Sequence, residues 1–368
     1  MIDPIKIKTP KGNIFIGPGY PTFIVAEISG NHHLDYHKAI QLIDAAIEAG
    51  VDAVKIQTYT ADTITLDSDK EAFRIKVNEA WRGMTLHQLY RMAYTPWDWQ
   101  PKLKKYAESN GVILFSTPFD ETAVDFLEKM DVQLYKIASF ETGHLPLLKK
   151  IGQTGKPVIM SRGGSTYKDI SLAIKTLKKA GAPQIAVLHC VSSYPAVYNQ
   201  MNLKTIPELA ERFDIITGLS DHTIASTVPV AAVALGASII EKHLIYSRSE
   251  GGPDAAFSME PKEFKEMVQD IRNVEVALGT PNAGIQTGES DNIVFRRSIF
   301  VAEDIKAGEI FTIKNIRIVR PGHGLHPRYY EEILGKRAKS DLEKGTPLEK
   351  KFVDYHFRDP SNERGYSE

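Results

Sequence analysis

Cysteine is almost absent from this 368-residue chain, in which Cys190 is the only one. A single thiol cannot form a disulfide within the chain, and this fits a reducing compartment. Residues 1–13 lack the apolar core of a secretion signal, and no run of about 18 apolar residues occurs. We therefore expect a cytoplasmic protein without a membrane span.

The chain also lacks an excess of charge of either sign. It has 45 Lys and Arg residues against 46 Asp and Glu residues, a formal net charge of −1. No global attraction to nucleic acid or to an anionic membrane is expected from this balance. An anionic ligand must therefore be bound by a local cluster of cations.

Short apolar runs rich in Ile and Val alternate with longer helical patterns between residues 20 and 280. This alternation predicts parallel strands, and eight such units predict a closed (β/α)8 TIM barrel. A doubly wound open sheet is the competing fold, but no Gly-x-Gly-x-x-Gly follows the first run. The expected strands are residues 23–29, 53–58, 113–117, 134–139, 157–161, 185–190, 216–222 and 239–244.

The alternation of apolar runs and helical patterns stops near residue 284, and this change divides the chain into domains. Residues 1–283 are expected to form the barrel domain, and 284–294, rich in Gly and polar residues, a linker. Residues 295–357 contain short alternating runs and predict a small β-rich domain. The polar end, 358–368, is expected to be disordered.

Polar side chains gather at the carboxyl end of nearly every expected strand. Buried strands seldom carry charge without a partner, and active-site groups of a barrel collect at this end. The pattern therefore predicts one shared polar pocket. The residues concerned are Glu27, Lys55, Gln57, Thr117, Lys136, Ser139, Glu141, Ser161, Tyr194, Ser220, His222 and His243.

His222 and His243 end two neighbouring strands and lie 21 residues apart in the sequence. Two imidazoles in one mouth can share a divalent metal and leave positions open for substrate and water. Mn²⁺ fits two nitrogen ligands with few carboxylates, and Mg²⁺ or Co²⁺ is an alternative. The competing interpretation makes each histidine a hydrogen-bonded structural residue.

Lys55 and Lys136 allow three interpretations. They can bind a phosphate or carboxylate, form structural ion pairs with Glu27 and Glu141, or form a Schiff base with a carbonyl substrate. Glu27 is either a general base or the counter-charge of a lysine. Asp254, in a Gly-rich loop after the last strand, can reach the mouth or simply form a turn.

Eight ordered motifs resemble the sialic acid synthase family and together cover about residues 20–355. The C-terminal domain is similar to the SAF, or antifreeze-like, domain of that family. Within the family, residues 55–73, 95–99 and 320–342 most resemble the pseudaminic acid branch. The motifs are AEISGNHHLDYHKA, DAVKIQTYTADTITL, LFSTPFD, YKIASFE, LHCVSSYP, GLSDHT, IIEKHL and VRPGHGLHP.

The resemblance implies a reaction in which phosphoenolpyruvate condenses with the open-chain aldehyde of an N-acetylated amino sugar. The enol C3 attacks the aldehyde carbon, water adds at C2, and phosphate leaves with C–O cleavage. A metal on His222 and His243 would polarise the aldehyde, and Glu27 would act on the water or on sugar ring opening. The residues implied to bind phosphoenolpyruvate are Lys55, Thr117, Lys136, Ser139, Ser161 and Ser220.

The resemblance also implies the sugar site and a homodimer. Arg320 would reach the sugar in the neighbouring subunit's barrel, so that the SAF domains are swapped between subunits. Ser192 stands where N-acetylneuraminate synthases tend to have Asn. This departure favours 2,4-diacetamido-2,4,6-trideoxy-L-altrose over N-acetylmannosamine or the legionaminic acid precursor. The implied sugar-binding residues are Gln57, Glu141, Tyr194, Asp254 and Arg320.

Two other classes of protein are weighed against this one. A Schiff-base aldolase would use Lys136 or Lys55 with pyruvate, and borohydride would trap its lysine adduct. A carbohydrate-binding or ice-binding protein would rest on the C-terminal domain alone. That class predicts an inert barrel mouth, which disagrees with the charged strand ends.

Overall fold

The computed structural model describes residues 2–9, 12–76 and 81–357 of the chain. The chain forms two compact units, Met1–Gly279 and Thr280–Glu368. Within the described residues, no helix combines the length and the apolar character that a membrane span requires. The tail expected to be disordered, 358–368, lies outside the described residues.

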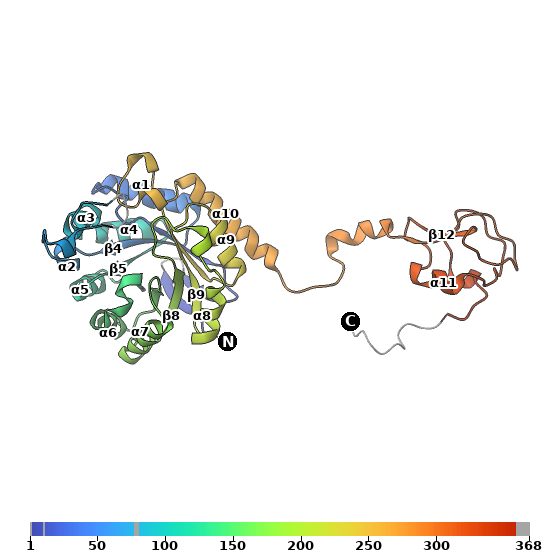
Figure 1. The fold of residues 1–368 in the computed structure, drawn as a ribbon, viewed down its shortest axis with the longest axis horizontal. Helices are drawn as coiled ribbons and strands as arrows, with labels where there is room; N and C mark the ends of the chain where they lie inside the picture. The colour runs from blue at the N-terminus through green and yellow to red at the C-terminus, as the bar shows by residue number, and fades with distance from the viewer. Residues whose placement is uncertain (1, 10–11, 77–80, 358–368) are drawn as a thin grey trace. The chain divides into compact units, whose positions relative to one another are not determined.

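Eight parallel strands of the first unit close into a barrel in the order β10-β3-β4-β5-β6-β7-β8-β9. Figure 1 shows the helices arranged around this barrel. The predicted TIM barrel is confirmed, and the open doubly wound sheet is wrong because β10 pairs with β3. The strands are β3 (Phe23–Glu27), β4 (Ala53–Thr58), β5 (Ile113–Pro118), β6 (Tyr135–Ile137), β7 (Val158–Ser161), β8 (Ile185–Cys190), β9 (Ile216–Asp221) and β10 (Ile239–His243).

Each barrel strand is buried on both faces because helices cover its outer side, which explains the continuous apolar runs. The first helix shows how the sequence sets its ends. Asp35 accepts hydrogen bonds from the N–H groups of His37 and Lys38, and Gly50 ends the helix at φ 83°. The helices of this unit are α1 (Tyr36–Ala49), α2 (Ala61–Ile64), α3 (Leu86–Ala93), α4 (Gln100–Ser109), α5 (Glu121–Lys129), α6 (Leu145–Gln153), α7 (Tyr167–Ala180), α8 (Thr205–Phe213), α9 (Thr227–Ala234) and α10 (Pro261–Leu278).

An antiparallel hairpin precedes the barrel and was not expected from the sequence. Its strands are β1 (Ile5–Thr9) and β2 (Gly12–Ile16). Ile5 and Ile16 are fully buried and join the same apolar cluster as Phe23, at the start of β3. The hairpin therefore packs at the amino-terminal end of the barrel and leaves the carboxyl ends of the strands to form the mouth.

The second unit is small and has its own apolar core, which includes Ile299, Phe311 and Leu348. Its strands β11 (Ser298–Val301) and β12 (Ile316–Val319) pair antiparallel. Isolated bridges such as Phe300 with Pro347 extend this β character. The 3₁₀ helix η6 (Thr287–Phe295) covers most of the predicted linker and ends one residue beyond it, and an α-helix, α11 (Tyr330–Ile333), belongs to the same unit.

Candidate active site

Two cavities that share lining residues occupy the mouth of the barrel. The inner one has a volume of about 70 Å³ and contains both candidate metal histidines in its lining. Strand alternation explains its composition, because side chains two residues apart, such as Lys55 and Gln57 on β4, share a face. All the residues implied to bind phosphoenolpyruvate line it, namely Lys55, Thr117, Lys136, Ser139, Ser161 and Ser220.

Glu241 links the two lysines of the inner cavity. Its Oε1 lies 3.7 Å from Lys55 Nζ and 3.7 Å from Lys136 Nζ, and Ser220 Oγ donates a hydrogen bond to it at 3.0 Å. The sequence analysis assigned no role to Glu241. The available signal was its spacing of two from His243, which puts both side chains on the inner face of β10.

The two lysines have different surroundings. Lys136 Nζ donates to Ser161 Oγ at 2.6 Å and to the Ile137 carbonyl at 3.1 Å. Burial lowers the pKa of Lys136, although Glu241 opposes the shift. Burial would also lower the pKa of Lys55, but the nearby carboxylates outweigh it and raise that pKa. The inner cavity therefore combines a firmly charged ammonium with one that loses its proton more readily.

The ion pairs with Glu27 and Glu141, one of the three interpretations of the lysines, form only in part. Lys55 contacts Glu27, and both side chains are almost fully buried. The carboxylate within ion-pair distance of Lys136 in the described chain is Glu241 rather than Glu141. Lys55 thus lies next to two acids, Glu27 and Glu241, whereas Lys136 lies next to Glu241.

Glu27 is fully buried and is not among the residues that line the inner or the outer cavity. Its Oε1 accepts hydrogen bonds from the Ser29 N–H at 2.9 Å and from Gln57 Nε2 at 3.5 Å. Burial raises the pKa of Glu27 to about 7, although the contact with Lys55 opposes this. A carboxyl group with this pKa can accept or release a proton near neutral pH.

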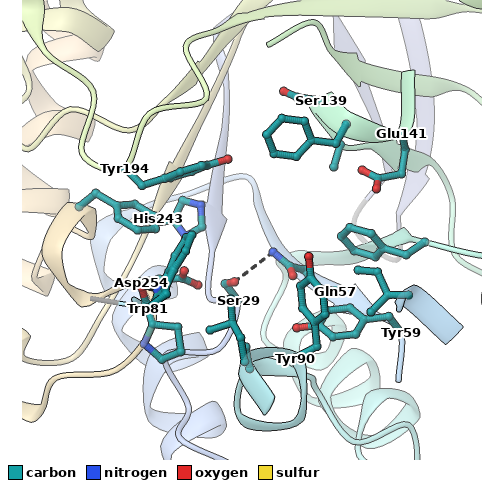
Figure 2. A pocket seen from close by; sticks show the side chains of 18 residues that line it. Ser29, Gln57, Tyr59, Trp81, Tyr90, Ser139, Glu141, Tyr194, His243 and Asp254 are labelled. Atoms are coloured by element: carbon teal, nitrogen blue, oxygen red, sulfur yellow. Dashed lines mark hydrogen bonds between the residues drawn. The ribbon is translucent and has the colours of Figure 1, made fainter. Parts of the chain in front are cut away.

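The outer cavity has a volume of about 330 Å³ and shares Gln57, Ser139, Tyr194 and His243 with the inner one. Figure 2 shows Tyr194 and His243 on one side of it and Glu141 on the other. Gln57 Nε2 donates to Ser29 Oγ at 3.0 Å, which orients the amide at the junction of the cavities. Aromatic rings form much of the wall: Tyr59, Trp81, Tyr90, Phe119, Phe140, Tyr194 and Phe257.

Two carboxyl groups line this aromatic cavity. Burial raises the pKa of Glu141 to about 7, and its Oε2 has no hydrogen-bond partner among the described residues. Burial also raises the pKa of Asp254, while a hydrogen bond from Ser29 opposes the shift. These groups can form hydrogen bonds with polar atoms of a ligand whose remaining surface contacts rings.

Trp81 is a wall residue that the sequence interpretation missed. Its Nε1 donates to the Pro253 carbonyl at 3.0 Å, and its ring centroid lies 5.9 Å from that of Tyr194. It belongs to the segment between β4 and α4, which carries no barrel strand. No periodic pattern marks such a position, so its place in the cavity depends on the tertiary fold.

His222 and His243 lie side by side, with ring centroids 5.4 Å apart. His222 Nδ1 lies 3.1 Å from the Val191 carbonyl, which can only accept a hydrogen bond. This contact places a proton on Nδ1, so that in the neutral ring Nε2 keeps its lone pair, as in many metal-binding histidines. Burial and the neighbouring His222 lower the pKa of His243 well below its usual range, so this ring is neutral.

These two imidazoles fit a divalent metal ion. Metal–nitrogen bonds are about 2.0–2.1 Å long, so both rings can contact one ion at this separation. The buried Nδ1 of His243 has no hydrogen-bond partner in the described chain. No group of three or more His, Cys, Asp or Glu side chains arranged for a metal occurs among the described residues.

Cys190, Ser192 and Arg320 have different surroundings in the structure. Cys190 lines the inner cavity, with Sγ 3.8 Å from Ser192 Oγ. Ser192 packs closely against Gly163, and a Cβ atom added at Gly163 would collide with the hydroxyl group of Ser192. Arg320 is exposed and belongs to the second unit.

Comparison with known proteins gives the family. Residues 42–283 match the model of the NeuB family, and residues 296–354 match the SAF domain. The pseudaminic acid synthase of Campylobacter jejuni subsp. jejuni (strain 81-176) is 42% identical over 326 residues, which cover 89% of this chain and 95% of that protein. The pseudaminic acid synthase of Helicobacter pylori is 42% identical over 330 residues, covering 89% and 96%.

A solved structure is similar as well. The N-acetylneuraminic acid (sialic acid) synthetase from Leptospira borgpetersenii, in complex with citrate, aligns with a TM-score of 0.69 and 32% identity. The alignment covers 79% of this chain and 96% of that one. With a barrel and a SAF domain both matched, the chain belongs to the NeuB family of sialic acid synthases, as its ordered motifs indicated.

Proposed function

We propose that this protein is a pseudaminic acid synthase that condenses phosphoenolpyruvate with 2,4-diacetamido-2,4,6-trideoxy-L-altrose to give pseudaminic acid and phosphate. One observation carries the proposal: a small cavity with two lysines opens into a larger aromatic cavity. The first suits a compact anion and the second a sugar with apolar substituents. The names of the relatives that are 42% identical over most of the chain support the same product.

Lys55 and Lys136 bind the phosphate and carboxylate groups of phosphoenolpyruvate, and hydroxyl groups complete the site. In the reaction, C3 of the enol forms a bond to the aldehyde carbon, and a water oxygen adds to C2. The bond from C2 to the phosphate oxygen then breaks, and phosphate leaves. The hydroxyl groups are those of Thr117, Ser139, Ser161 and Ser220.

Glu27 supplies or accepts a proton during this reaction, either at the attacking water or in the opening of the sugar ring. A pKa of about 7 supports this role because both protonation states are populated near neutral pH. Gln57 donates a hydrogen bond to Glu27 and lines both cavities, which links the carboxyl group to both proposed substrate sites. Glu241 holds the two lysines in place through its ion pairs.

His222 and His243 hold a divalent metal, which we propose to be Mn²⁺, with Mg²⁺ or Co²⁺ as alternatives. When bound, such an ion supplies Lewis-acid polarisation of a carbonyl oxygen. The Val191 carbonyl orients His222 for this task, and the burial of His243 keeps its imidazole neutral.

The outer cavity selects the sugar. Gln57, Glu141, Tyr194 and Asp254 form hydrogen bonds with the hydroxyl and acetamido groups, while the rings contact the methyl groups. A 6-deoxy sugar with two acetamido groups presents three methyl groups, and their contact with rings is favourable. Arg320 contributes from the partner subunit's SAF domain, so the working enzyme is a cytoplasmic homodimer with exchanged SAF domains.

A phosphate-release assay tests this function. The protein, Mn²⁺ and phosphoenolpyruvate are incubated with 2,4-diacetamido-2,4,6-trideoxy-L-altrose, the legionaminic acid precursor or N-acetylmannosamine, and product masses are recorded. We expect the altrose derivative to give the highest kcat/KM. Faster phosphate release with N-acetylmannosamine would refute the assigned sugar, and no release with any of the three would refute the synthase.

A further inference from the structure

A third cavity, of about 580 Å³, lies outside the barrel mouth at the ends of β7 and β8. Among the described residues, none that lines it lines either mouth cavity. Its polar lining comes from the loops after both strands and from the start of α8. The residues that bear on its chemistry are Arg162, His189, Val191, Lys204 and Glu208.

Strand alternation places this cavity back to back with the inner one. Ser161 and Cys190 line the inner mouth cavity. Their sequence neighbours Arg162 and His189 line the third cavity instead. Successive residues of a strand point to opposite faces, so one wall of barrel backbone separates the two sites.

His189 lines this cavity and carries a buried hydrogen-bond acceptor. The side chain is 1% exposed, and its Nε2 contacts the Met201 carbonyl. A carbonyl oxygen only accepts, so the proton of the neutral ring is on Nε2 and the lone pair is on Nδ1. This Nδ1 is buried without a partner in the described part of the chain.

Two cationic residues, Arg162 and Lys204, also line the cavity. Arg162 Nε is also buried without a hydrogen-bond partner among the described residues, and Lys204 is exposed at the rim. The carboxylate of Glu208 already binds Arg212 at 3.0 Å and accepts a hydrogen bond from Tyr167. The cavity therefore offers two cationic donors beside one buried acceptor.

We propose that this cavity is a second anion site that binds inorganic phosphate as hydrogen phosphate. Arg162 and Lys204 donate to the ionised oxygens, and the remaining P–OH group donates to His189 Nδ1. Near neutral pH, inorganic phosphate always retains at least one such hydroxyl group, whereas sulfate has none. Sulfate would leave the buried acceptor unpaired, which is costly, so the site should discriminate between these two anions of similar size.

This inference extends beyond the condensation reaction and does not depend on the sugar used. Phosphate is a product of the proposed reaction, so the ligand would be present wherever the enzyme works. Val191 lines the third cavity, and its carbonyl holds His222 Nδ1. An anion bound there would lie next to the backbone that orients a candidate metal ligand.

Equilibrium dialysis of the full chain against radiolabelled inorganic phosphate at pH 8 tests the site. Saturating phosphoenolpyruvate should displace phosphate from the inner cavity and leave one phosphate per wild-type chain. Under the same conditions Arg162→Met should weaken the remaining site at least tenfold. Lys175→Met, which removes an exposed cation of α7, is the control for net charge and should bind like the wild type.

Two outcomes would overturn the proposal: displacement of all phosphate from the wild type by phosphoenolpyruvate, or unchanged binding in Arg162→Met. If phosphoenolpyruvate displaces none, the inner site of the proposed function fails, while the Arg162→Met comparison still tests the second site. Competition by unlabelled sulfate tests the selectivity of the second site. We expect sulfate to compete at least tenfold less well than phosphate at the second site, and equal competition would refute the role of His189.

Discussion

His222 directly follows β9, His243 ends the adjacent parallel strand β10, and their ring centroids lie 5.4 Å apart. The residue before each histidine belongs to a buried ion pair, in which Lys242 Nζ lies 2.6 Å from Asp221 Oδ2. Both charged side chains are 0% exposed. The same two strands are therefore joined on the outer side by this ion pair and carry the two imidazoles on the inner side.

Breaking this ion pair should destabilise the barrel. Lys242→Met leaves the Asp221 carboxylate buried without its cation, which typically costs about 3–5 kcal/mol. Asp221→Leu combined with Lys242→Met removes both charges and should recover most of that loss. Urea unfolding measures the free energies. A double variant no more stable than Lys242→Met would contradict this account of the pair.

The metal site predicts a loss of affinity when the imidazoles are removed. His222→Ala together with His243→Ala should abolish tight Mn²⁺ binding, measured by calorimetry, and should abolish activity. The wild type should lose activity in a chelator and regain it when Mn²⁺ is restored. Full wild-type activity in the chelator would rule out the metal.

Glu141 predicts a pH-dependent stability difference. Burial raises its pKa from 4.5 to about 7, so the folded state retains a proton that the unfolded chain releases between these pH values. Glu141 therefore lowers stability progressively as pH rises through this window, and fully above pH 7. Glu141→Gln cannot ionise. The difference in unfolding free energy between Glu141→Gln and the wild type should therefore be larger at pH 8 than at pH 4.5, by on the order of 2 kcal/mol in favour of the variant. Urea unfolding at both pH values measures this difference in free energy, and a difference that does not change with pH would contradict the raised pKa of Glu141.

The sequence predicted the barrel well because each strand is a short apolar run bounded by polar loops. It also predicted the inner cavity, since parallel strands bring their carboxyl ends together. The hairpin Ile5–Ile16 was missed because its significance lies in packing against Phe23, a tertiary contact. The link of Glu241 to two lysines and the place of Trp81 in the outer wall likewise depend on register and loop conformation.

Lys136 gives the sharpest mutational test of the inner cavity. Lys136→Ala removes a cation from a buried site and should abolish measurable phosphoenolpyruvate binding in calorimetry. Lys175→Ala makes the same change of charge on the surface of α7 and should leave binding unchanged. Borohydride reduction with pyruvate should trap no lysine adduct, whereas an adduct on Lys136 or Lys55 would support the aldolase.

Arg320 tests the exchanged SAF domain. Arg320→Ala should raise KM for the sugar at least tenfold more than KM for phosphoenolpyruvate, because the proposed contact involves the sugar alone. Arg317→Ala removes a nearby exposed arginine of β12 and serves as the matched control. Equal effects of Arg320→Ala on both constants would argue against the arrangement.

A crystal structure with phosphoenolpyruvate bound tests the central claim most directly. The account predicts its phosphate and carboxylate within hydrogen-bond distance of Lys55 Nζ and Lys136 Nζ, with C3 facing the aromatic cavity beside His243. Phosphoenolpyruvate bound elsewhere, with both lysines still engaged only by Glu27 and Glu241, would contradict it.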